Sequence, residues 1–365
     1  MSARTIVFIL SYSNNQNAIK RIEEFKKHGV QVEAYGFKRN DISNINADSV
    51  SVNEIGAYNN LMSYRKRVPI IYRGIRSVVK KYKNSDVLFY LFGLDVAGLF
   101  RMQSSKPYIY EEEDLIYTYF RNSIVRKLFT LLDRYIVNKS ARTVFTSEGF
   151  AIFHFGSNWS KKVCIIPNKL KNTVMDYPAI PKEIDINHLK IAFVGSFRFK
   201  SVYNFAKVFL ESFPNFTFHF FGSATDKENE DLFDGLKKYN NCVFHGRFKN
   251  PIDLPSVYAQ FDLLLSTYDI EFENVKYAEP NKLYEAIYYD TPIIVSSNCF
   301  LGDKVEKMGV GYSINALDDA EVVSFIKGLT LDSINERIKT IKEIDKQYAI
   351  DGNSEFIENI KAELL

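Results

Sequence analysis

One sequence feature constrains the fold of this chain more than any other: short, continuously apolar runs alternate with longer amphipathic segments, and this series occurs twice. Residues 6–10 (IVFIL) form the first apolar run, and residues 191–194 (IAFV) restart the series after a polar stretch. Unbroken apolar runs of this length indicate strands buried on both faces. Such strands, separated by helices, predict a parallel sheet with helices on both sides, built here twice.

The individual elements follow from the same periodicity. A helix over 17–28 is predicted to end at Gly29, a residue typical of helix C-termini. Further helices are expected at 68–82, 123–137 and after Val202, and the charged tail from about 332 is expected to be helical. The strands are predicted at 6–10, 30–35, 87–92, 108–110, 143–145, 163–166, 191–194, 216–221, 243–246, 263–265 and 292–295.

The length of 365 residues exceeds what one hydrophobic core usually serves, so two domains are expected. Residues 171–188 contain Pro178 and Pro181 without an apolar period, which indicates an interdomain linker. The predicted organisation is therefore a domain over 1–170, a linker over 171–188, a second domain over 189–345, and a C-terminal helix over 346–365 that can pack back on the first domain.

The composition excludes several classes of protein. An apolar share of 46% with 25% charged residues is typical of a globular chain, and a net charge of +3 does not indicate a nucleic-acid partner. Three widely spaced cysteines favour buried thiols in a reducing compartment. The N-terminus does not resemble a signal peptide, and no run approaches the roughly 18 apolar residues of a membrane span. We therefore expect a cytoplasmic protein.

The turn after the strand at 191–194 is a candidate phosphate-binding site. Gly195 and Ser196 end the strand, and Arg198 and Lys200 precede a helix. A glycine admits backbone N–H groups close to a phosphate, a helix N-terminus attracts anions, and the two cations can neutralise a diphosphate. The alternative is an ordinary turn with solvated cations. The segment matches neither the dinucleotide-binding nor the P-loop signature.

A second candidate is the segment 280–285. Pro280 suits the first turn of a helix, and Asn281, Lys282 and Glu285 follow within one turn. A carboxylate at the carboxyl edge of a parallel sheet can accept two ribose hydroxyl groups, and a lysine there can contact phosphate. The alternative is a surface helix whose charged side chains bind nothing.

Two charged segments lie in the first domain. Glu111, Glu112, Glu113 and Asp114 end a strand, where they can supply a base or contact sugar hydroxyls, or form a solvated acidic turn. The cations of 65–83 alternate with aliphatic residues, so this helix either contacts an anionic membrane surface or packs through its aliphatic face. The five histidines show no ligand spacing, so we expect no metal site and no cofactor.

The C-terminal segments resemble the donor-site motif of family 4-like retaining glycosyltransferases. Residues 280–287 (PNKLYEAI) and 290–295 (DTPIIV) carry the resemblance, and further motifs of that family follow the same order along the chain. The matching stretch covers about residues 140–315, while the first domain matches only in outline. The supporting motifs are 163–168 (VCIIPN), 195–200 (GSFRFK), 244–247 (FHGR) and 258–262 (YAQFD).

The resemblance implies a GT-B fold: two Rossmann-like domains whose parallel sheets face a central cleft. The nucleotide-sugar donor would bind the second domain, and a saccharide or lipid-linked saccharide acceptor would bind the first. The implied activity is sugar transfer with retention, without a metal, in capsule, O-antigen or exopolysaccharide assembly. Apart from the resemblance, the N-terminus predicts a cytoplasmic protein, and membrane contact by the basic helix over 65–83 would place it at the inner face of the membrane.

The resemblance also implies a role for each candidate residue. Glu285 is expected on the ribose, and Glu113 with Asp114 at the position where many members carry a His-Asp pair. Position 277 is tyrosine, whereas the family pairs a glutamate there with the one at 285. A nucleotide-sugar epimerase and a non-catalytic nucleotide-sugar-binding module remain alternatives. The remaining expected contacts are Gly195, Ser196, Arg198 and Lys200 with the diphosphate, Asn281 and Lys282 near the donor, and Glu279 and Pro280 near the donor sugar.

Overall fold

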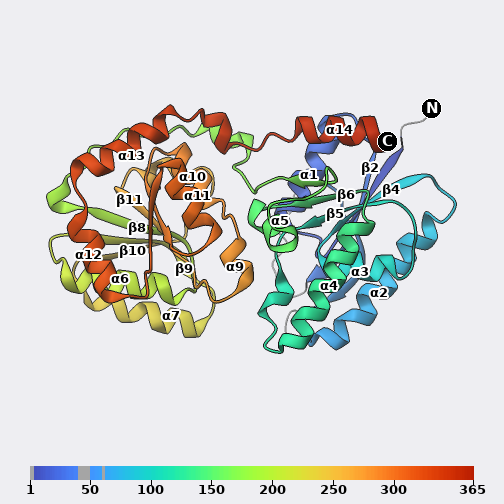
Figure 1. Ribbon diagram of the computed structural model, residues 1–365, viewed down its shortest axis with the longest axis horizontal. Helices are drawn as coiled ribbons and strands as arrows, with labels where there is room; N and C mark the ends of the chain where they lie inside the picture. Colours follow the sequence, from blue (N-terminus) through green and yellow to red (C-terminus); the bar gives the residue numbers. More distant parts are fainter. Residues whose placement is uncertain (1–3, 40–49, 60–61) are drawn as a thin grey trace. The chain divides into compact units, whose positions relative to one another are not determined.

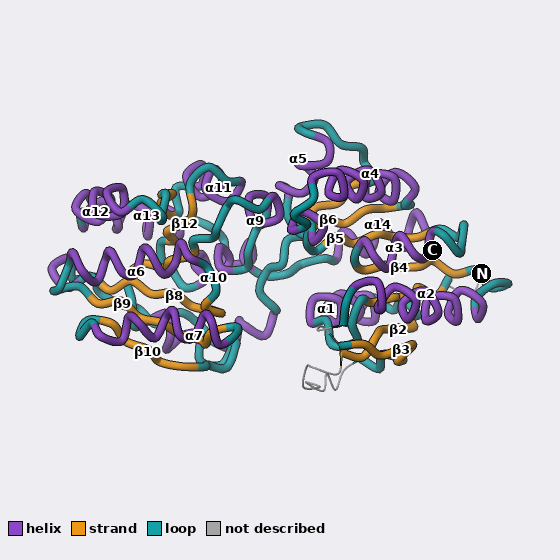
Figure 2. Tube along the Cα trace, turned by 90° about the horizontal axis from the view of Figure 1, so that it is seen from below, coloured by secondary structure: helices purple, strands orange, loops and turns teal. Residues whose placement is uncertain are grey.

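The computed structural model describes residues 4–39, 50–59 and 62–365, and the chain forms two compact units (Figure 1). The first comprises Met1–Pro167 together with Gly352–Leu365, and the second comprises Asn168–Asp351. In each unit every strand pairs in parallel with its neighbours, and helices flank the sheet (Figure 2). The α/β class expected from the apolar periodicity is confirmed.

The first unit contains a seven-stranded sheet with the order β3-β2-β1-β4-β5-β6-β7. Strand β4 (VLFYLF) is buried at every position and β1 (TIVFIL) at every position after Thr5, because helices cover both faces of the sheet. Its elements are β1 (Thr5–Leu10), α1 (Gln16–Lys27), β2 (Val32–Arg39), β3 (Asn53–Tyr58), α2 (Tyr64–Lys81), β4 (Val87–Phe92), α3 (Leu94–Arg101), β5 (Tyr108–Glu112), η1 (Ile116–Tyr119), α4 (Ser123–Lys139), β6 (Arg142–Phe145), α5 (Glu148–Phe155), β7 (Val163–Ile165) and α14 (Ser354–Leu364).

The C-terminal helix α14 packs against α1 in this first unit (Figure 1). Ile357 and Ile360 are buried in the same core as strands β1 and β4. The ring of Phe356 meets the ring of Phe25 edge-on at 6.1 Å between centroids. The last fourteen residues therefore complete a core that begins at the other end of the chain.

The second unit contains a six-stranded sheet with the order β10-β9-β8-β11-β12-β13, with one apolar core on each face. Its elements are η2 (Asn172–Asp176), η3 (Ile186–His188), β8 (Lys190–Phe197), α6 (Lys200–Ser212), β9 (Thr217–Ala224), α7 (Lys227–Asp234), η4 (Gly235–Lys238), β10 (Cys242–Gly246), α8 (Leu254–Tyr258), β11 (Leu263–Ser266), α9 (Glu273–Tyr277), α10 (Lys282–Tyr288), β12 (Ile293–Ser296), α11 (Phe300–Met308), β13 (Gly311–Ile314), α12 (Asp319–Gly328), α13 (Leu331–Glu343) and η5 (Lys346–Ala349).

The segment 171–188, expected as a linker, is part of the second unit. Val174 is buried in the core, and the amine of Lys182 donates hydrogen bonds to Tyr258 O at 2.8 Å and to Thr291 Oγ1 at 2.9 Å. Burial lowers the pKa of Lys182 to about 8. The prolines and charges of 171–188 suggested a solvated linker. The contacts of Val174 and Lys182 instead attach this segment to the second unit.

The periodicity did not predict β3 and β13. Both are short edge strands: β3 (NEIGAY) is mostly accessible, and β13 has four residues. Strands of this kind contain no continuous apolar run, so they carry little signal. In the described part of the chain, no helix is long and apolar enough to cross a membrane.

Candidate functional site

The acidic segment at the end of β5 is mostly buried, so its interpretation as a solvated turn is wrong for the three glutamates. Glu111 and Glu112 are buried, Glu113 is half-buried, and only Asp114 is exposed. Successive side chains of a strand point to opposite faces of the sheet, so the three glutamates meet different partners.

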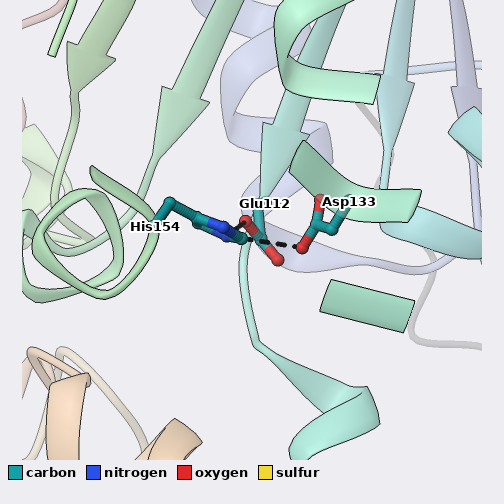
Figure 3. A group of neighbouring side chains, drawn as sticks. All are labelled: Glu112, Asp133 and His154. Carbon is teal, nitrogen blue, oxygen red and sulfur yellow. Dashed lines mark hydrogen bonds and ion pairs between the residues drawn. The ribbon is translucent and has the colours of Figure 1, made fainter. Parts of the chain in front are cut away.

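Glu112 lies beside His154 of α5 and Asp133 of α4 (Figure 3). The Nε2 atom of His154 is 3.0 Å from Glu112 Oε2 and 3.4 Å from Asp133 Oδ2, and all three side chains are buried. Tyr110 donates a hydrogen bond to Asp133 Oδ1 at 3.0 Å. The sequence contains no signal that these residues are neighbours, because they come from three separate elements, β5, α4 and α5.

The three side chains shift one another's pKa values. Burial opposes an imidazolium, but the charge of Glu112 and the hydrogen bonds to both carboxylates outweigh it and raise the pKa of His154 to about 10. Burial and the nearby Asp133 raise the pKa of Glu112, whereas hydrogen bonds from His154 and Glu112 outweigh burial and lower the pKa of Asp133. Among the described residues this is the one group whose donor atoms are close enough for a metal. Within the protein these contacts form an ion-paired triad, and a metal bound here would have to displace the imidazole proton.

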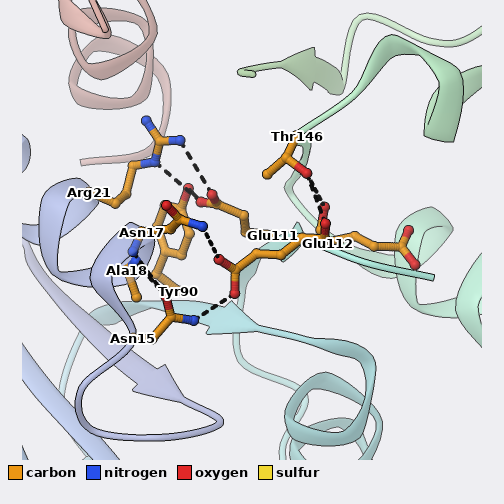
Figure 4. Close-up of polar contacts among 9 residues, drawn as sticks. Asn15, Asn17, Ala18, Arg21, Tyr90, Glu111, Glu112 and Thr146 are labelled. Carbon is orange, nitrogen blue, oxygen red and sulfur yellow. Dashed lines mark hydrogen bonds and ion pairs between the residues drawn. The ribbon is translucent and has the colours of Figure 1, made fainter. Parts of the chain in front are cut away.

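Glu111 and Glu113 both contact residues of α1 or its N-cap (Figure 4). Arg21 of α1 donates to both oxygens of Glu111 at 3.3 Å, and Tyr90 also donates to that carboxylate. Glu113 accepts hydrogen bonds from the Nδ2 atoms of Asn15 at 2.6 Å and Asn17 at 3.1 Å. Helix α1 and its N-cap thus hold the acidic segment, together with Tyr90 of β4.

Glu113 is the titratable group of this segment that changes charge near neutral pH. Burial, followed by the charge of Glu111, raises the pKa of Glu113 to about 7, against the opposing hydrogen bonds from Asn15 and Asn17. Asn15 also accepts from the N–H groups of Asn17 and Ala18, which makes it the N-cap of α1. A polar residue before an amphipathic helix predicts such a cap, but nothing in the sequence pairs it with Glu113.

In the second unit, Glu285 of α10 is fully buried. Its Oε2 atom accepts hydrogen bonds from Tyr258 at 2.7 Å and from Lys282 Nζ at 2.5 Å. Its Oε1 atom is buried and has no hydrogen-bond partner among the described residues. A buried oxygen without a hydrogen bond lowers the stability of the fold by about 1–3 kcal/mol. Such an atom can accept a hydrogen bond from a ligand hydroxyl.

The end of β8 lies next to the ion pair between Lys282 and Glu285. Gly195 has a φ of 151°, a conformation that side chains with a Cβ rarely adopt, and a Cβ built there would lie 4.0 Å from Lys282 Cε. Ser196, Arg198 and Lys200 are exposed. The structure therefore brings Gly195, Lys282 and Glu285 together and leaves both predicted phosphate-binding cations accessible.

The N-terminus of α6 is occupied by a protein carboxylate. Asp269 accepts hydrogen bonds from the backbone N–H groups of Lys200 at 3.1 Å and Ser201 at 2.9 Å. The sequence suggested the N-terminus of this helix for a phosphate, with the helix starting near Val202 rather than at Lys200. Any diphosphate here would depend on side-chain cations and on other backbone groups.

The start of the donor motif differs slightly from expectation. The helix α10 begins at Lys282, and Pro280 and Asn281 form the turn before it, with Leu283 N donating to Pro280 O at 3.2 Å. Glu279 is buried, and its Oε1 atom accepts from Lys304 Nζ at 2.6 Å and from Tyr284, while Oε2 has no partner among the described residues. Lys304, which lies on α11, has no sequence signal linking it to this motif.

No protein-family model and no curated protein matches the chain. Solved structures are similar to it over almost its full length. A sucrose-phosphate synthase from Thermosynechococcus elongatus has a TM-score of 0.71 at 13% identity, covering 98% of both chains. HepE from Anabaena, in complex with UDP and glucose, has a TM-score of 0.67 at 15% identity, covering 99% of this chain and 100% of HepE.

A UDP-GlcNAc 2-epimerase from Neisseria meningitidis, bound to UDP-GlcNAc, has a TM-score of 0.62 at 13% identity, covering 99% of both chains. Likeness at these identities establishes architecture, and the same architecture serves different reactions. Together with the two parallel sheets, it shows that this chain has the GT-B fold.

Proposed function

We propose that the protein is a glycosyltransferase that takes its sugar from a nucleotide-sugar, with a uridine nucleotide as the first donor class to test. The observation that carries the proposal is the buried Glu285, whose Oε1 atom has no partner among the described residues. Lys282 of α10 pairs with it, and Gly195 at the end of β8 lies beside Lys282. In parallel α/β sheets this edge is where ligands bind. HepE, which has this fold, was solved with UDP and glucose.

In the proposed donor site, Glu285 Oε1 accepts a hydrogen bond from a ribose hydroxyl. Lys282, Arg198 and Lys200 supply the positive charge for the diphosphate, since Asp269 occupies the first N–H groups of α6. We assign Asn281 and Ser196 to the same site, and Glu279 and Pro280 to the sugar end. These roles rest on the motif order, on the exposure of Ser196 and Asn281, and on the buried oxygen of Glu279 that has no partner among the described residues.

The transfer breaks the bond between the anomeric carbon of the sugar and the diphosphate and forms a bond from that carbon to the acceptor hydroxyl. We assign the proton of that hydroxyl to Glu113, because a carboxyl group with a pKa of about 7 exchanges protons at neutral pH. Asp114, exposed next to it, is proposed to contact the acceptor. A saccharide or lipid-linked saccharide acceptor, retention, and a role in surface polysaccharide assembly follow from the motif resemblance.

A second candidate function is epimerisation of a nucleotide-sugar. One 2-epimerase shares the fold, and removal of a proton from a sugar carbon needs a base such as Glu113. Incubation of the protein with UDP-GlcNAc alone separates the two functions. An epimerase forms a new nucleotide-sugar without an acceptor, whereas a transferase leaves the donor unchanged or hydrolyses it slowly.

A thermal-shift screen with UDP-, GDP-, ADP- and CMP-sugars tests the proposed donor site. Saturation at one hundred times the Kd stabilises the folded protein by about 2.7 kcal/mol, which raises the melting temperature. The Glu285→Gln variant keeps the shape of the side chain but weakens acceptance of the ribose hydroxyl, so its ligand-induced shift should shrink.

Glu336→Gln, at an exposed position on α13, is the matched control and should retain the full shift. The comparison uses the ligand-induced shift of each variant, because Glu285→Gln also changes the pair with Lys282. If no nucleotide-sugar shifts the wild-type melting temperature, the proposed function is wrong.

A further inference from the structure

Helix α4 exposes an apolar stripe on the surface of the first unit. Along 124–135 its accessible side chains are 39% to 70% exposed, although they are large and apolar. Their spacing of three or four residues places them on one face of the helix. The α4 stripe consists of Ile124, Leu128, Leu131, Leu132 and Tyr135.

The other face of α4 is already used for packing. Ile136 and Val137 are buried in the unit, and Phe129 packs on Tyr117 of η1 with 6.4 Å between ring centroids. The α4 stripe is therefore a second apolar face that the unit itself does not cover. It extends about 16 Å along the helix axis at 1.5 Å per residue.

The exposed charged residues of 121–139 are all positive. Lys127 is one turn from both Ile124 and Leu131, Arg121 and Arg126 flank the start of the helix, and Lys139 is at its end; all four are exposed. Asp133 is the single acidic residue of α4, and it is buried in the triad. The exposed surface of α4 thus combines apolar side chains with cations.

Helix α2, the one predicted to contact a membrane, lacks such a face. Its aliphatic residues Ile71, Ile75 and Val78 are buried, so the interpretation that it packs through its aliphatic side is the one the structure supports. Its exposed cations, including Arg73 and Arg76, remain on the surface. Because α3 packs against both α2 and α4, the three helices lie side by side on one face of the sheet (Figure 1).

We propose that the α4 stripe binds the surface of an anionic lipid bilayer, with the helix lying in the plane of the membrane and the neighbouring cations on the lipid headgroups. An apolar face bordered by Lys and Arg is the pattern of helices that bind membrane interfaces. A second copy of the chain fits less well, because pairing α4 with α4 would oppose like charges such as Lys127. This inference goes beyond the proposed function and does not depend on it.

Flotation of the full chain with lipid vesicles tests the proposal. The wild type should float with vesicles of mixed phosphatidylcholine and phosphatidylglycerol, float much less with phosphatidylcholine alone, and lose binding at high salt. Leu128→Ser/Leu131→Ser should reduce the bound fraction at limiting lipid about tenfold or more, since both leucines leave water on binding. Arg126→Gln/Lys127→Gln should reduce binding to anionic vesicles only.

The matched control is Ile252→Ser/Leu317→Ser, which changes two apolar residues of the second unit that are both 54% exposed. It should float like the wild type. All these positions are on the surface, so every variant should keep the wild-type melting temperature within a few degrees, and this is measured alongside. Equal loss in the control, or unchanged flotation of the leucine variant, would overturn the proposal.

A direct contact is read by fluorescence. Trp159 is the one tryptophan of the chain, so Leu131→Trp in a Trp159→Phe background places a single reporter in the α4 stripe. Its emission should shift to shorter wavelength with anionic vesicles, and brominated lipids should quench it. A concentration-dependent dimer in sedimentation, abolished by Leu128→Ser/Leu131→Ser without any vesicle binding, would show instead that the stripe joins two copies.

Discussion

At the scale of single residues, the acidic segment after β5 shows how strongly neighbours determine the role of one residue type. Three successive glutamates have three different environments: a guanidinium for Glu111, a histidine for Glu112 and two amides for Glu113. Only Glu113 combines partial exposure with a pKa of about 7. It is therefore the glutamate suited to proton transfer.

The first prediction concerns the pH dependence of transfer. If Glu113 must be ionised, kcat/KM should rise with pH through an apparent pKa near 7, because burial holds the proton on the carboxyl group below that pH. Glu113→Gln should lower kcat by about 10²–10⁴ and remove this limb of the profile. Activity that remains flat from pH 5 to 9 in the wild type would contradict the assignment, as would a variant with normal kcat.

The second prediction isolates Asn17. Its Nδ2 atom donates to Glu113, whereas the capping of α1 depends on Asn15. Asn17→Ala removes a hydrogen bond that favours the ionised carboxylate, so the acid limb of the kcat/KM profile should move to higher pH while the melting temperature changes little. Gln16→Ala, at the exposed position between them, should leave the profile in place.

At the scale of secondary-structure elements, the Glu112–Asp133–His154 triad ties β5 to α4 and α5. Breaking one partner of a buried ion pair costs about 3–5 kcal/mol, because the remaining charges lose their compensation. The third prediction is that His154→Gln lowers the free energy of unfolding by about this amount in urea titrations. His188→Gln, at an exposed site, should change it by less than about 0.5 kcal/mol.

The same triad predicts a pH dependence of stability. The folded-state pKa of His154 is about 10, above the unfolded value near 6.5, so its contribution is complete below about pH 6.5 and is lost as pH rises through 10. Urea unfolding of the wild type should therefore show a decline in stability between about pH 7 and 10 that His154→Gln lacks. Parallel pH profiles for the two proteins would contradict a charged histidine.

At the scale of the whole molecule, the chain returns to its first unit through α14. Ile357 is fully buried in the same core as β1, although it lies 352 positions after Thr5 (357 − 5), where that strand begins. The fourth prediction is that Ile357→Ala destabilises the first unit by about 2–5 kcal/mol in calorimetry. Glu358→Ala, exposed on the same helix, is the control, and donor binding to the second unit should survive both changes.

Much of the architecture could be predicted from local sequence. Apolar runs predict the buried strands at 87–92 and 263–265, and a glycine predicts the end of the first helix. These signals depend on neighbouring residues only. In the structure Gly29 has a φ of 75°, as expected of a glycine that follows a helix. Edge strands β3 and β13 and the attachment of 171–188 could not be predicted, since they depend on contacts with distant segments.

The candidate site divides in the same way. The motif around Glu285 and the acidic cluster at Glu113 are visible in the sequence as short patterns of residue types. Their electrostatics are not: Asn15, Asn17 and Tyr258 come from other elements, and a pKa near 7 needs both burial and the neighbouring Glu111.

The sequence by itself determined that this protein has two parallel α/β units and where its chemically informative residues lie along the chain. Periodicity of apolar residues is a local property, and it is sufficient to specify strands, helices and their order. Only the tertiary structure decided which charges are neutralised, which glutamate can exchange a proton, and which helix, α4 rather than α2, leaves its apolar side uncovered. Those outcomes depend on burial and pairing between residues far apart in sequence, and no local pattern records them.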